Sequence, residues 1–225
     1  MPKTVVIDGL IGAGKSTCIG VLHKTMPKVT DYTVLVCKEP VDLWKSSGRL
    51  AMFYSDMKRR SFQFQCLVFH SRVRQYQQVY QQAVELEADG KNVLILMERS
   101  IFSDCFFANI LHEQGDMDDS ELEDYMDLWQ MWTETMPAVP DIFIFLRPKL
   151  NTVMERLHDR NRSEESGVSR DYQQHLLVKH DDWYEPGERD LNGQHCPMHV
   201  LDTDFNYRDS EEGARRLTEM ILEVI

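Results

Sequence analysis

The sequence is poor in basic residues and has no long apolar run. Its 25 lysines and arginines face 37 aspartates and glutamates, so the formal charge is −12. Nucleic acids and anionic membrane surfaces are bound largely through basic surface, of which this chain has little. The apolar runs are short, and residues 93–97 suit a buried strand rather than the ~18 residues that a membrane span needs. We therefore expect neither a nucleic-acid partner nor a membrane partner.

Cysteines are also few and dispersed. The five thiols show no CxxC pair and no Cys/His spacing of a metal site; they are Cys18, Cys37, Cys66, Cys105 and Cys196. An odd, scattered set inside apolar stretches is typical of reduced structural thiols, which disfavours a disulfide framework and a zinc site. A strand that begins near Thr4 leaves no room for a targeting peptide. We therefore expect a cytoplasmic or nuclear protein.

The sequence lacks internal repeats, low-complexity tracts and linkers rich in Pro, Gly or Ser, which predicts a single domain over residues 1–225. Five runs of apolar and β-branched residues are separated by longer helical patterns; they cover residues 4–7, 33–37, 93–97, 141–146 and 198–201. Strands that alternate with helices predict right-handed crossovers and a parallel sheet. The runs lack in/out alternation, as expected for strands covered on both faces. We predict an α/β fold with a five-stranded parallel sheet flanked by helices.

Capping signals predict the helix boundaries. The first helix is expected to begin near Lys15, and a long helix over residues 61–89 to stop at Gly90. Ser120 and Glu123 form a capping-box signature for a helix that extends toward Met136. Further helical patterns cover residues 150–160, 170–183 and 210–224.

A glycine-rich motif follows the first strand directly. The segment from Gly9 to Ser16 matches G-x-x-x-x-G-K-[ST]. Glycines let the backbone curl so that successive N–H groups face an anion, and the N-terminus of the following helix adds its dipole. Lys15 is expected to reach the β- and γ-phosphates of a nucleotide, and the Ser16 hydroxyl to ligate Mg²⁺. We assign the triphosphate site to Gly9, Gly12, Ala13, Gly14, Lys15, Ser16 and Thr17.

Acidic residues follow the second and third strands, at the edge where a parallel sheet binds its ligands. Glu39 would repel a triphosphate unless it had a role there, such as accepting the proton of an attacking hydroxyl. Trp44, in the same segment, offers a flat wall for a base or a sugar. Glu98 is placed to hold Mg²⁺, and Arg99 to donate to a phosphate or to Glu39. The alternative is a surface Glu, a packed Trp and an ion pair at a strand end.

Three arginines gather in one short segment of this acidic chain. Arg156 and Arg160 lie one helical turn apart on a shared face, and Arg162 follows the expected helix end. A lid over about residues 156–170 that closed these arginines on the γ-phosphate would stabilise transition-state charge and exclude water. The alternative is a solvated, charged helix end.

Taken in order, these motifs and the pair Phe64-Gln65 resemble the deoxynucleoside kinase family over nearly the whole chain. The resemblance implies a P-loop kinase fold, ATP as phosphate donor, Mg²⁺ as cofactor, and a homodimer formed through the helix that begins near Ser61. The implied reaction moves the γ-phosphoryl of ATP to the 5′-hydroxyl of a deoxyribonucleoside, for nucleotide salvage and DNA synthesis. The implied catalytic residues are Glu39, Arg99, Lys15, Arg160 and Arg162.

The resemblance also assigns residues to the substrates. Gln65 would pair with the edge of the base, and helical spacing places Val68 and Arg72 on the same face. Asp104 would face Arg72, as in the deoxycytidine and deoxyguanosine kinases, whereas the thymidine-accepting members carry smaller, uncharged residues there. The remaining matches are Tyr54 and Glu165 at the sugar 3′-hydroxyl, and Asp204 and Phe205 around the adenine of ATP.

The sequence departs from the family around the base. The segment after Asp104 is one residue shorter than usual, so Phe107 is expected to line the base pocket, and Arg60 replaces a frequent tryptophan. The pair of Arg72 and Asp104 favours deoxycytidine or a purine deoxynucleoside, with thymidine left open. Two alternatives remain: a thymidylate-type monophosphate kinase, in which Arg72 and Arg99 would bind the acceptor's phosphate, and a non-catalytic nucleotide switch.

Overall fold

The computed structural model describes residues 1–135, 139–160 and 167–225. Within these ranges the strands are β1 Lys3–Gly9, β2 Tyr32–Cys37, β3 Asn92–Glu98, β4 Ile142–Leu146, β5 Glu188–Leu191 and β6 Gln194–Leu201. The helices are α1 Lys15–Thr25, the 3-10 turn η1 Met26–Lys28, α2 Val41–Ser46, α3 Arg49–Ser55, α4 Met57–Ala88, α5 Cys105–Glu113, α6 Asp119–Thr135, α7 Leu150–Arg160, α8 Arg170–Tyr184 and α9 Glu211–Leu222.

The strands form one sheet in the order β2-β3-β1-β4-β6-β5. All neighbouring pairs from β2 to β6 are parallel, and β5 alone is antiparallel to its neighbour. The predicted α/β class and the five predicted parallel strands are confirmed, and the sheet has a sixth strand, β5, that was not predicted. Strand β5 could not be recognised from the sequence, because its residues Glu-Arg-Asp-Leu are mostly charged. The hairpin that creates it turns at Asn192 and Gly193, both with positive φ, as tight two-residue turns require.

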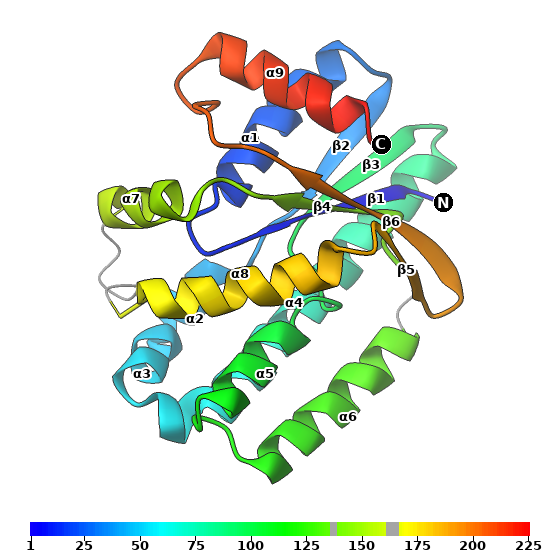
Figure 1. Ribbon diagram of the computed structural model, residues 1–225. Coiled ribbons are helices and arrows are strands. Elements are labelled where there is room, and N and C mark those ends of the chain that lie inside the picture. The colour runs from blue at the N-terminus through cyan, green and yellow to red at the C-terminus, as the bar shows by residue number, and fades with distance from the viewer. Residues whose placement is uncertain (136–138, 161–166) are drawn as a thin grey trace.

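Helices cover both faces of the sheet (Figure 1). In β1, Val5 and Ile7 pack toward α1 and α9, whereas Val6 packs into the larger core beneath α4, α5 and α6. Successive side chains of a strand point to opposite faces, so a strand buried on both faces is apolar throughout. This explains why the strand runs show no alternation. Among the described residues, no helix is both long and apolar enough to cross a bilayer.

The carboxyl ends of the parallel strands point to one side of the molecule, the left of Figure 1. Central strand β1 pairs Ile7 with Glu98 of β3 and Gly9 with Leu146 of β4. The loop after β1 therefore lies between the ends of β3 and β4. Glu39 follows the end of β2 by two residues, which places it at the same edge.

Helix starts differ from their predicted positions by one turn or less. Helix α4 begins at Met57 rather than near Ser61, because the side chain of Asp56 accepts a hydrogen bond from Arg59 N and caps it earlier. Helix α6 has a capping box, but Asp118 and Glu121 form it. The predicted pair of Ser120 and Glu123 does not. Gly90 follows α4 with φ 78°, as predicted for a helix stop, and the predicted end of α6 at Met136 lies outside the described residues.

Helices α2, α3 and α5 were not predicted. They are six to nine residues long, too short for a helical period to stand out from the surrounding apolar residues. They follow β2 and β3, so they line the carboxyl edge of the sheet and bring side chains to it.

Helix α9 packs against the loop that follows β6 through Gly213. A Cβ atom at Gly213 would lie 1.9 Å from the carbonyl oxygen of Asn206, whereas one at Gly20 of α1 would meet no atom within 4 Å. We predict that Gly213→Ala destabilises the protein by about 1–3 kcal/mol, as overpacking does. The matched control Gly20→Ala should stabilise it by about 0.4–1 kcal/mol. Thermal unfolding measures both, and equal melting temperatures for the two variants would contradict the close contact.

Candidate active site

A cavity of about 1610 Å³ opens at the carboxyl edge of the sheet. It runs from α1, α7 and the loop after β6 at one end to α3 and α4 at the other. Single-ligand pockets usually measure about 300–1,000 Å³, so this cavity has room for two ligands. The predicted site residues that line it are Gly12, Gly14, Lys15, Ser16, Thr17, Glu39, Trp44, Tyr54, Phe64, Gln65, Val68, Arg72, Glu98, Arg99, Asp104, Phe107, Arg156, Arg160, Asp204 and Phe205.

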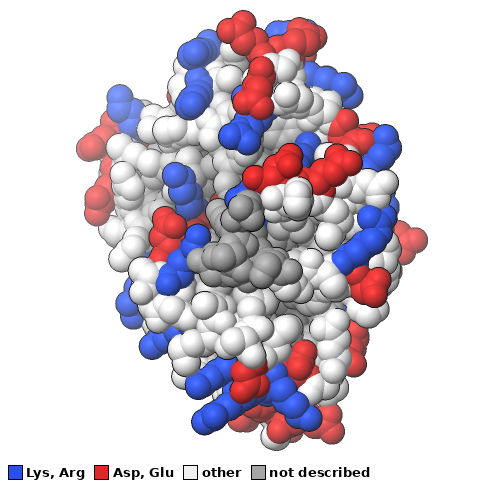
Figure 2. Space-filling view, turned by 90° about the vertical axis from the view of Figure 1, so that its left-hand side faces the viewer, with Lys and Arg blue, Asp and Glu red and all other residues white. Residues whose placement is uncertain are grey.

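Figure 2 looks onto this side of the molecule and shows how its charges are distributed. Acidic and basic side chains alternate over the face. On the described part of this face they form no continuous basic stripe, which is the surface that nucleic-acid binding requires.

The loop between β1 and α1 has the conformation that its glycines predict. Gly9, Gly12 and Gly14 have φ of 151°, 91° and 99°, a region that side chains rarely adopt. At Gly14 a Cβ atom would also lie 2.1 Å from the hydroxyl oxygen of Tyr207. Gly9 and Ala13 shape this loop without lining the cavity. The loop therefore needs glycine both for its backbone and for close packing.

Lys15 lies at the first turn of α1 and is 6% exposed. Its Nζ donates to the carbonyl oxygens of Gly9 and Leu10, at 3.2 and 2.8 Å. Burial and the nearby Arg99 lower the pKa of Lys15 to about 8. The ammonium is thus held over the loop, where a bound phosphate would exchange those carbonyl contacts for charged ones.

Ser16 and Glu98 face each other at the wall of the cavity. The Ser16 hydroxyl donates to Glu98 Oε1 at 2.6 Å. A hydroxyl and a carboxylate are oxygen ligands of the kind that Mg²⁺ prefers, and Mg²⁺ usually completes its shell with water and phosphate. In the described part of the chain no three His, Cys, Asp or Glu side chains form a metal cluster. The pair therefore fits a magnesium ion that arrives with a nucleotide rather than a permanently bound metal.

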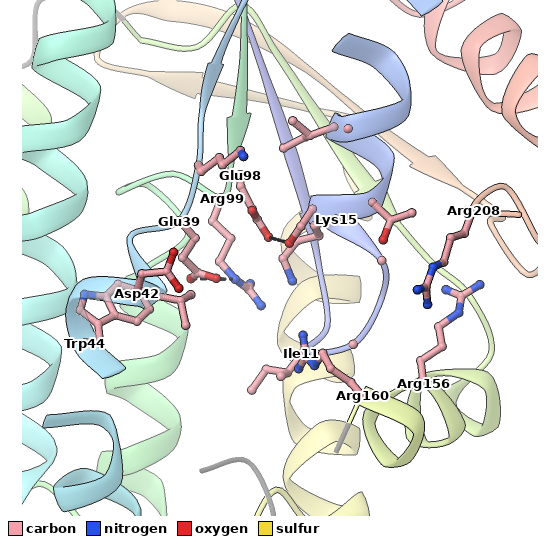
Figure 3. Close-up of a pocket in the computed structure, with 18 of the residues that line it drawn as sticks. Ile11, Lys15, Glu39, Asp42, Trp44, Glu98, Arg99, Arg156, Arg160 and Arg208 are labelled. Atoms are coloured by element: carbon pink, nitrogen blue, oxygen red, sulfur yellow. Dashed lines mark hydrogen bonds and ion pairs between the residues drawn. The ribbon is translucent and has the colours of Figure 1, made fainter. Parts of the chain in front are cut away.

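Glu39 contacts two arginines, Arg72 and Arg99, and Figure 3 shows it pointing toward Arg99. Its Oε1 accepts from Arg72 Nη2 at 2.5 Å and lies 3.6 Å from Arg99 Nε. Burial raises the pKa of Glu39, but Arg72, Arg99 and Lys15 outweigh it and hold that pKa below its usual value. Glu39 is therefore a carboxylate at neutral pH. It can accept a proton, provided that an incoming hydroxyl replaces one of its arginine contacts.

Arg99 is held in an unusual backbone conformation, with φ 61°. Its N–H donates to the carbonyl oxygen of Ile7 at 3.1 Å, which fixes the residue against the end of β1. The guanidinium carbon lies 4.8 Å from the centroid of the Phe107 ring. Phe107 thus lines the cavity beside Arg99, as a cation–π partner, at the position where the shortened segment predicts it.

The far end of the cavity is aromatic and ends in buried polar groups. Phe64 stacks on Phe53 with ring centroids 4.5 Å apart, and Trp44 packs edge-on against Phe64 at 5.9 Å. Gln65 is 5% exposed, and its Oε1 has no hydrogen-bond partner within the described protein. Such an atom is costly unless a ligand satisfies it. This end suits a flat aromatic ligand that carries hydrogen-bonding groups on its edge.

Arg72 joins the two ends of the cavity. Besides contacting Glu39, it forms an ion pair through Nη1 with Asp104, and both arginine and aspartate are at most 3% exposed. The contact with Asp104 is the one that the resemblance implies. The contact with Glu39 was not predicted, because no motif spacing relates the two residues.

Arg156 holds the phosphate loop to the loop that follows β6. Its Nη1 donates to the carbonyl oxygen of Ala13 at 2.9 Å, and its Nη2 lies 3.4 Å from that of Phe205. The Tyr207 hydroxyl also donates to Ala13, at 3.2 Å. Asp204 in turn accepts from Thr152 at 2.6 Å. In this structure Arg156 therefore connects two loops, and its predicted contact with ATP stays a prediction.

The predicted lid is only partly described. Arg160 extends from the end of α7 toward Ile11 of the phosphate loop and lines the cavity (Figure 3). Arg162 and Glu165 lie outside the described residues, so the structure places neither of them. The lid and the contact of Glu165 with a sugar stay predictions.

Several cavity residues were not predicted from the sequence. Phe53 and Tyr207 are the most important of them, since one stacks on Phe64 and the other binds the phosphate loop. Tyr172 and Arg208 also line the cavity. Phe53 lies one position before the predicted Tyr54, and Tyr207 lies two positions after the predicted Phe205. This proximity to predicted residues was the only sequence signal that Phe53 and Tyr207 belong to the site.

The chain is similar to known kinases over nearly its full length. A family model described as "Deoxynucleoside kinase" matches residues 5–225. A Fowlpox virus (strain NVSL) protein named "Probable deoxycytidine kinase" is 34% identical over 183 residues, which cover 80% of this chain and 71% of that protein. "Deoxycytidine kinase" of Rattus norvegicus is 30% identical over 238 residues, which cover 93% of this chain and 87% of that protein.

The fold is also similar to that of a solved structure. The structure described as deoxyadenosine kinase from M. mycoides with bound dCTP aligns with a TM-score of 0.73, at 22% sequence identity, over 98% of this chain and 97% of that chain. At this identity the likeness shows a shared fold.

The position of Arg156 gives a prediction that separates a tether from a lid. Arg156→Met should weaken ATP binding about tenfold or more, since a hydrogen bond from a charged group is worth about 1.5–3 kcal/mol. Turnover at saturating ATP should change little. The matched control, Arg215→Met on the exposed side of α9, should leave both unchanged. A large loss of turnover with normal ATP affinity would instead place Arg156 at the transferred phosphoryl group.

Proposed function

We propose that this chain, which belongs to the deoxynucleoside kinase family, binds ATP in its cavity over the phosphate loop. The deoxyribonucleoside binds in the same cavity, between α3, α4 and α5. The chain is an ATP-dependent deoxynucleoside kinase, and residues 1–225 act as a single domain. The observation that supports this placement is the position of Glu39. This residue lies between the phosphate loop and the aromatic end, where the 5′-hydroxyl of a nucleoside would meet the γ-phosphate.

The reaction proposed for this site is a direct transfer between two bound substrates. Glu39 accepts the proton of the 5′-hydroxyl as the oxygen attacks the γ-phosphorus, and the bond from that phosphorus to ADP breaks. Lys15 and Arg99 neutralise charge on the phosphoryl oxygens. Arg160 approaches the phosphate loop from α7 and adds a further positive charge. Because the acceptor hydroxyl is neutral, this reaction requires a base, and a phosphorylated acceptor would not.

Mg²⁺ is the cofactor in this proposal. Ser16 Oγ and Glu98 would hold it, directly or through water, and it would supply positive charge to the phosphates. Its support is the facing hydroxyl and carboxylate of these two residues, 2.6 Å apart.

The nucleoside we propose is deoxycytidine or deoxyadenosine. Cytosine and adenine each carry an exocyclic amino group, which is a donor, whereas thymine presents a carbonyl oxygen at the corresponding position. The Asp104 carboxylate would accept from the amino group, and Arg72 would donate to the neighbouring ring nitrogen. A thymine carbonyl would face the same carboxylate and be repelled. Gln65, with its unpartnered Oε1, would complete the contacts.

We further propose a homodimer that uses the long helix α4. Its support is a set of exposed apolar side chains on α4 and on α6, which contacts it: Val84, Leu128 and Met131. Exposed apolar groups on neighbouring helices are typical of surfaces that become buried on association.

Glu39→Gln tests the proposed base. The amide keeps the size of the side chain but cannot take the proton, so we predict a fall in kcat of about 10²- to 10⁴-fold. The KM for the nucleoside should change much less. Glu185→Gln, an exposed change at the end of α8, is the control. Steady-state kinetics with deoxycytidine measure both, and a near-normal kcat for Glu39→Gln would remove it as the base.

Neutralising the buried ion pair tests the proposed base readout. In the double variant Arg72→Val with Asp104→Ala, we predict that kcat/KM for thymidine rises relative to deoxycytidine by about tenfold, which corresponds to 1.4 kcal/mol. Arg72→Val alone should be the more damaging change to stability, since it leaves Asp104 buried and unpaired. Arg74→Met, on the exposed side of α4, is the control. An unchanged ratio in the double variant would show that the pair does not read the base.

A further inference from the structure

A buried pair of ionisable groups lies beneath the phosphate loop, outside the cavity. Asp8 of β1 and His180 of α8 are both 0% exposed. His180 Nε2 lies 3.4 Å from Asp8 Oδ1. The reaction proposed above uses neither side chain, although ionisable groups are costly to bury unless they are paired. The burial of these two groups therefore needs a physical explanation.

Both ring nitrogens of His180 face hydrogen-bond acceptors. Nδ1 lies 2.7 Å from the carbonyl oxygen of Leu176, and Nε2 faces the Asp8 carboxylate. An imidazole donates to two acceptors only when both nitrogens carry a proton. The surrounding rings suit a cation, since Phe145 stacks on the imidazole at 5.0 Å and Phe106 packs against it at 5.4 Å. A doubly protonated ring would satisfy both acceptors at once.

Asp8 connects this pair to the active site. Its Oδ1 also accepts from Gly9 N at 2.8 Å and from Arg99 Nη1 at 3.0 Å. Burial raises the pKa of Asp8, but His180 and Arg99 hold it well below its usual range, so the group is a carboxylate. A single oxygen therefore holds the first residue of the phosphate loop and the guanidinium that faces Glu39.

Two carboxylates compete for Arg99. Asp8 Oδ1 is 3.0 Å from one of its nitrogens, and Glu39 Oε1 is 3.6 Å from another. A single guanidinium cannot neutralise both carboxylates. Without another cation near Asp8, the closer Asp8 carboxylate would attract Arg99 more strongly than Glu39 does, because charges interact strongly in a buried site. A doubly protonated His180 would bring a second positive charge to the Asp8 side. With that charge beside Asp8, Arg99 would keep its contact toward Glu39 and the cavity.

We propose that His180 and Asp8 are positioning residues that keep Arg99 directed at Glu39 and the transferred phosphoryl group. The inference rests on the proposed function, since the pair acts through Arg99 and touches no substrate. Around the pair, β4 and α5 contribute the uncharged rings of Phe145 and Phe106. Tyr184 of α8 stays neutral, because burial raises the pKa of its phenol well above the usual value.

A double-mutant cycle tests the proposal. His180→Phe keeps an aromatic ring and removes both N–H donors, and we expect it to lower kcat with deoxycytidine up to about 100-fold, as small misplacements of catalytic groups do. In an Arg99→Met background the same change should cost less than about threefold, because coupled residues are not additive. The KM for deoxycytidine should change little in either background. His175→Phe, on the exposed side of the same helix, is the control and should leave kcat unchanged.

Equal losses in both backgrounds would overturn the proposal, since a purely structural role does not depend on Arg99. Should His180→Phe fail to fold, Asp8→Asn takes its place in the cycle, because it keeps the shape of the side chain and removes its charge. The ring nitrogens of His180 in the unmodified protein give a second test that needs no turnover. NMR at neutral pH should show both nitrogens protonated, and a singly protonated ring would contradict the ion pair. If NMR showed both nitrogens of His180 protonated but the protein turned over no nucleoside, the proposed function would be wrong, while the ion pair between His180 and Asp8 would still be supported.

Discussion

Compensation of buried charge at the carboxyl edge of the sheet is the constraint on which the site depends. The carboxylates of Asp8, Glu39 and Asp104 share two arginines, Arg72 and Arg99, and Asp8 also contacts His180. Each arginine contacts two carboxylates, and removing Arg72 leaves Asp104 buried without its ion-pair partner. Because Arg72 contacts both Asp104 and Glu39, the base end and the phosphate end of the cavity belong to one network. In the proposed function, this network would link recognition of the base to activation of the hydroxyl.

The fold brings these charges together through strand order, with Arg72 added from helix α4. Strand β1 lies between β3 and β4, so the phosphate loop meets Glu98 and Arg99 on one side and the start of α7 on the other. Glu39 arrives from β2, and Asp104 precedes α5. Tyr207 and Arg156 then tie the loop after β6 to the phosphate loop. The site is assembled from the connections that follow the five parallel strands of one sheet.

Part of this site could be predicted because strand order fixes position. The phosphate loop, Glu39, Glu98 and Arg99 each follow a strand, and the carboxyl ends of parallel strands meet at one edge. The contacts of Arg156 with Ala13 and Phe205 could not be predicted, because helical spacing shows which residues share a face and not which backbone lies opposite. Strand β5 was missed because charged residues hide it. His180 and Asp8 are 172 positions apart in the sequence, and no sequence motif includes both residues. Long-range pairs of this kind become visible only in the folded chain.

The most direct test of the account is ATP consumption by the purified protein with one acceptor at a time. The acceptors are deoxycytidine, deoxyadenosine, deoxyguanosine, thymidine and thymidine monophosphate. The central claim is that Glu39 serves a neutral hydroxyl acceptor, so we expect turnover with at least one nucleoside, led by deoxycytidine or deoxyadenosine, and none with the monophosphate. Turnover with the monophosphate alone, or with no acceptor at all, would contradict it.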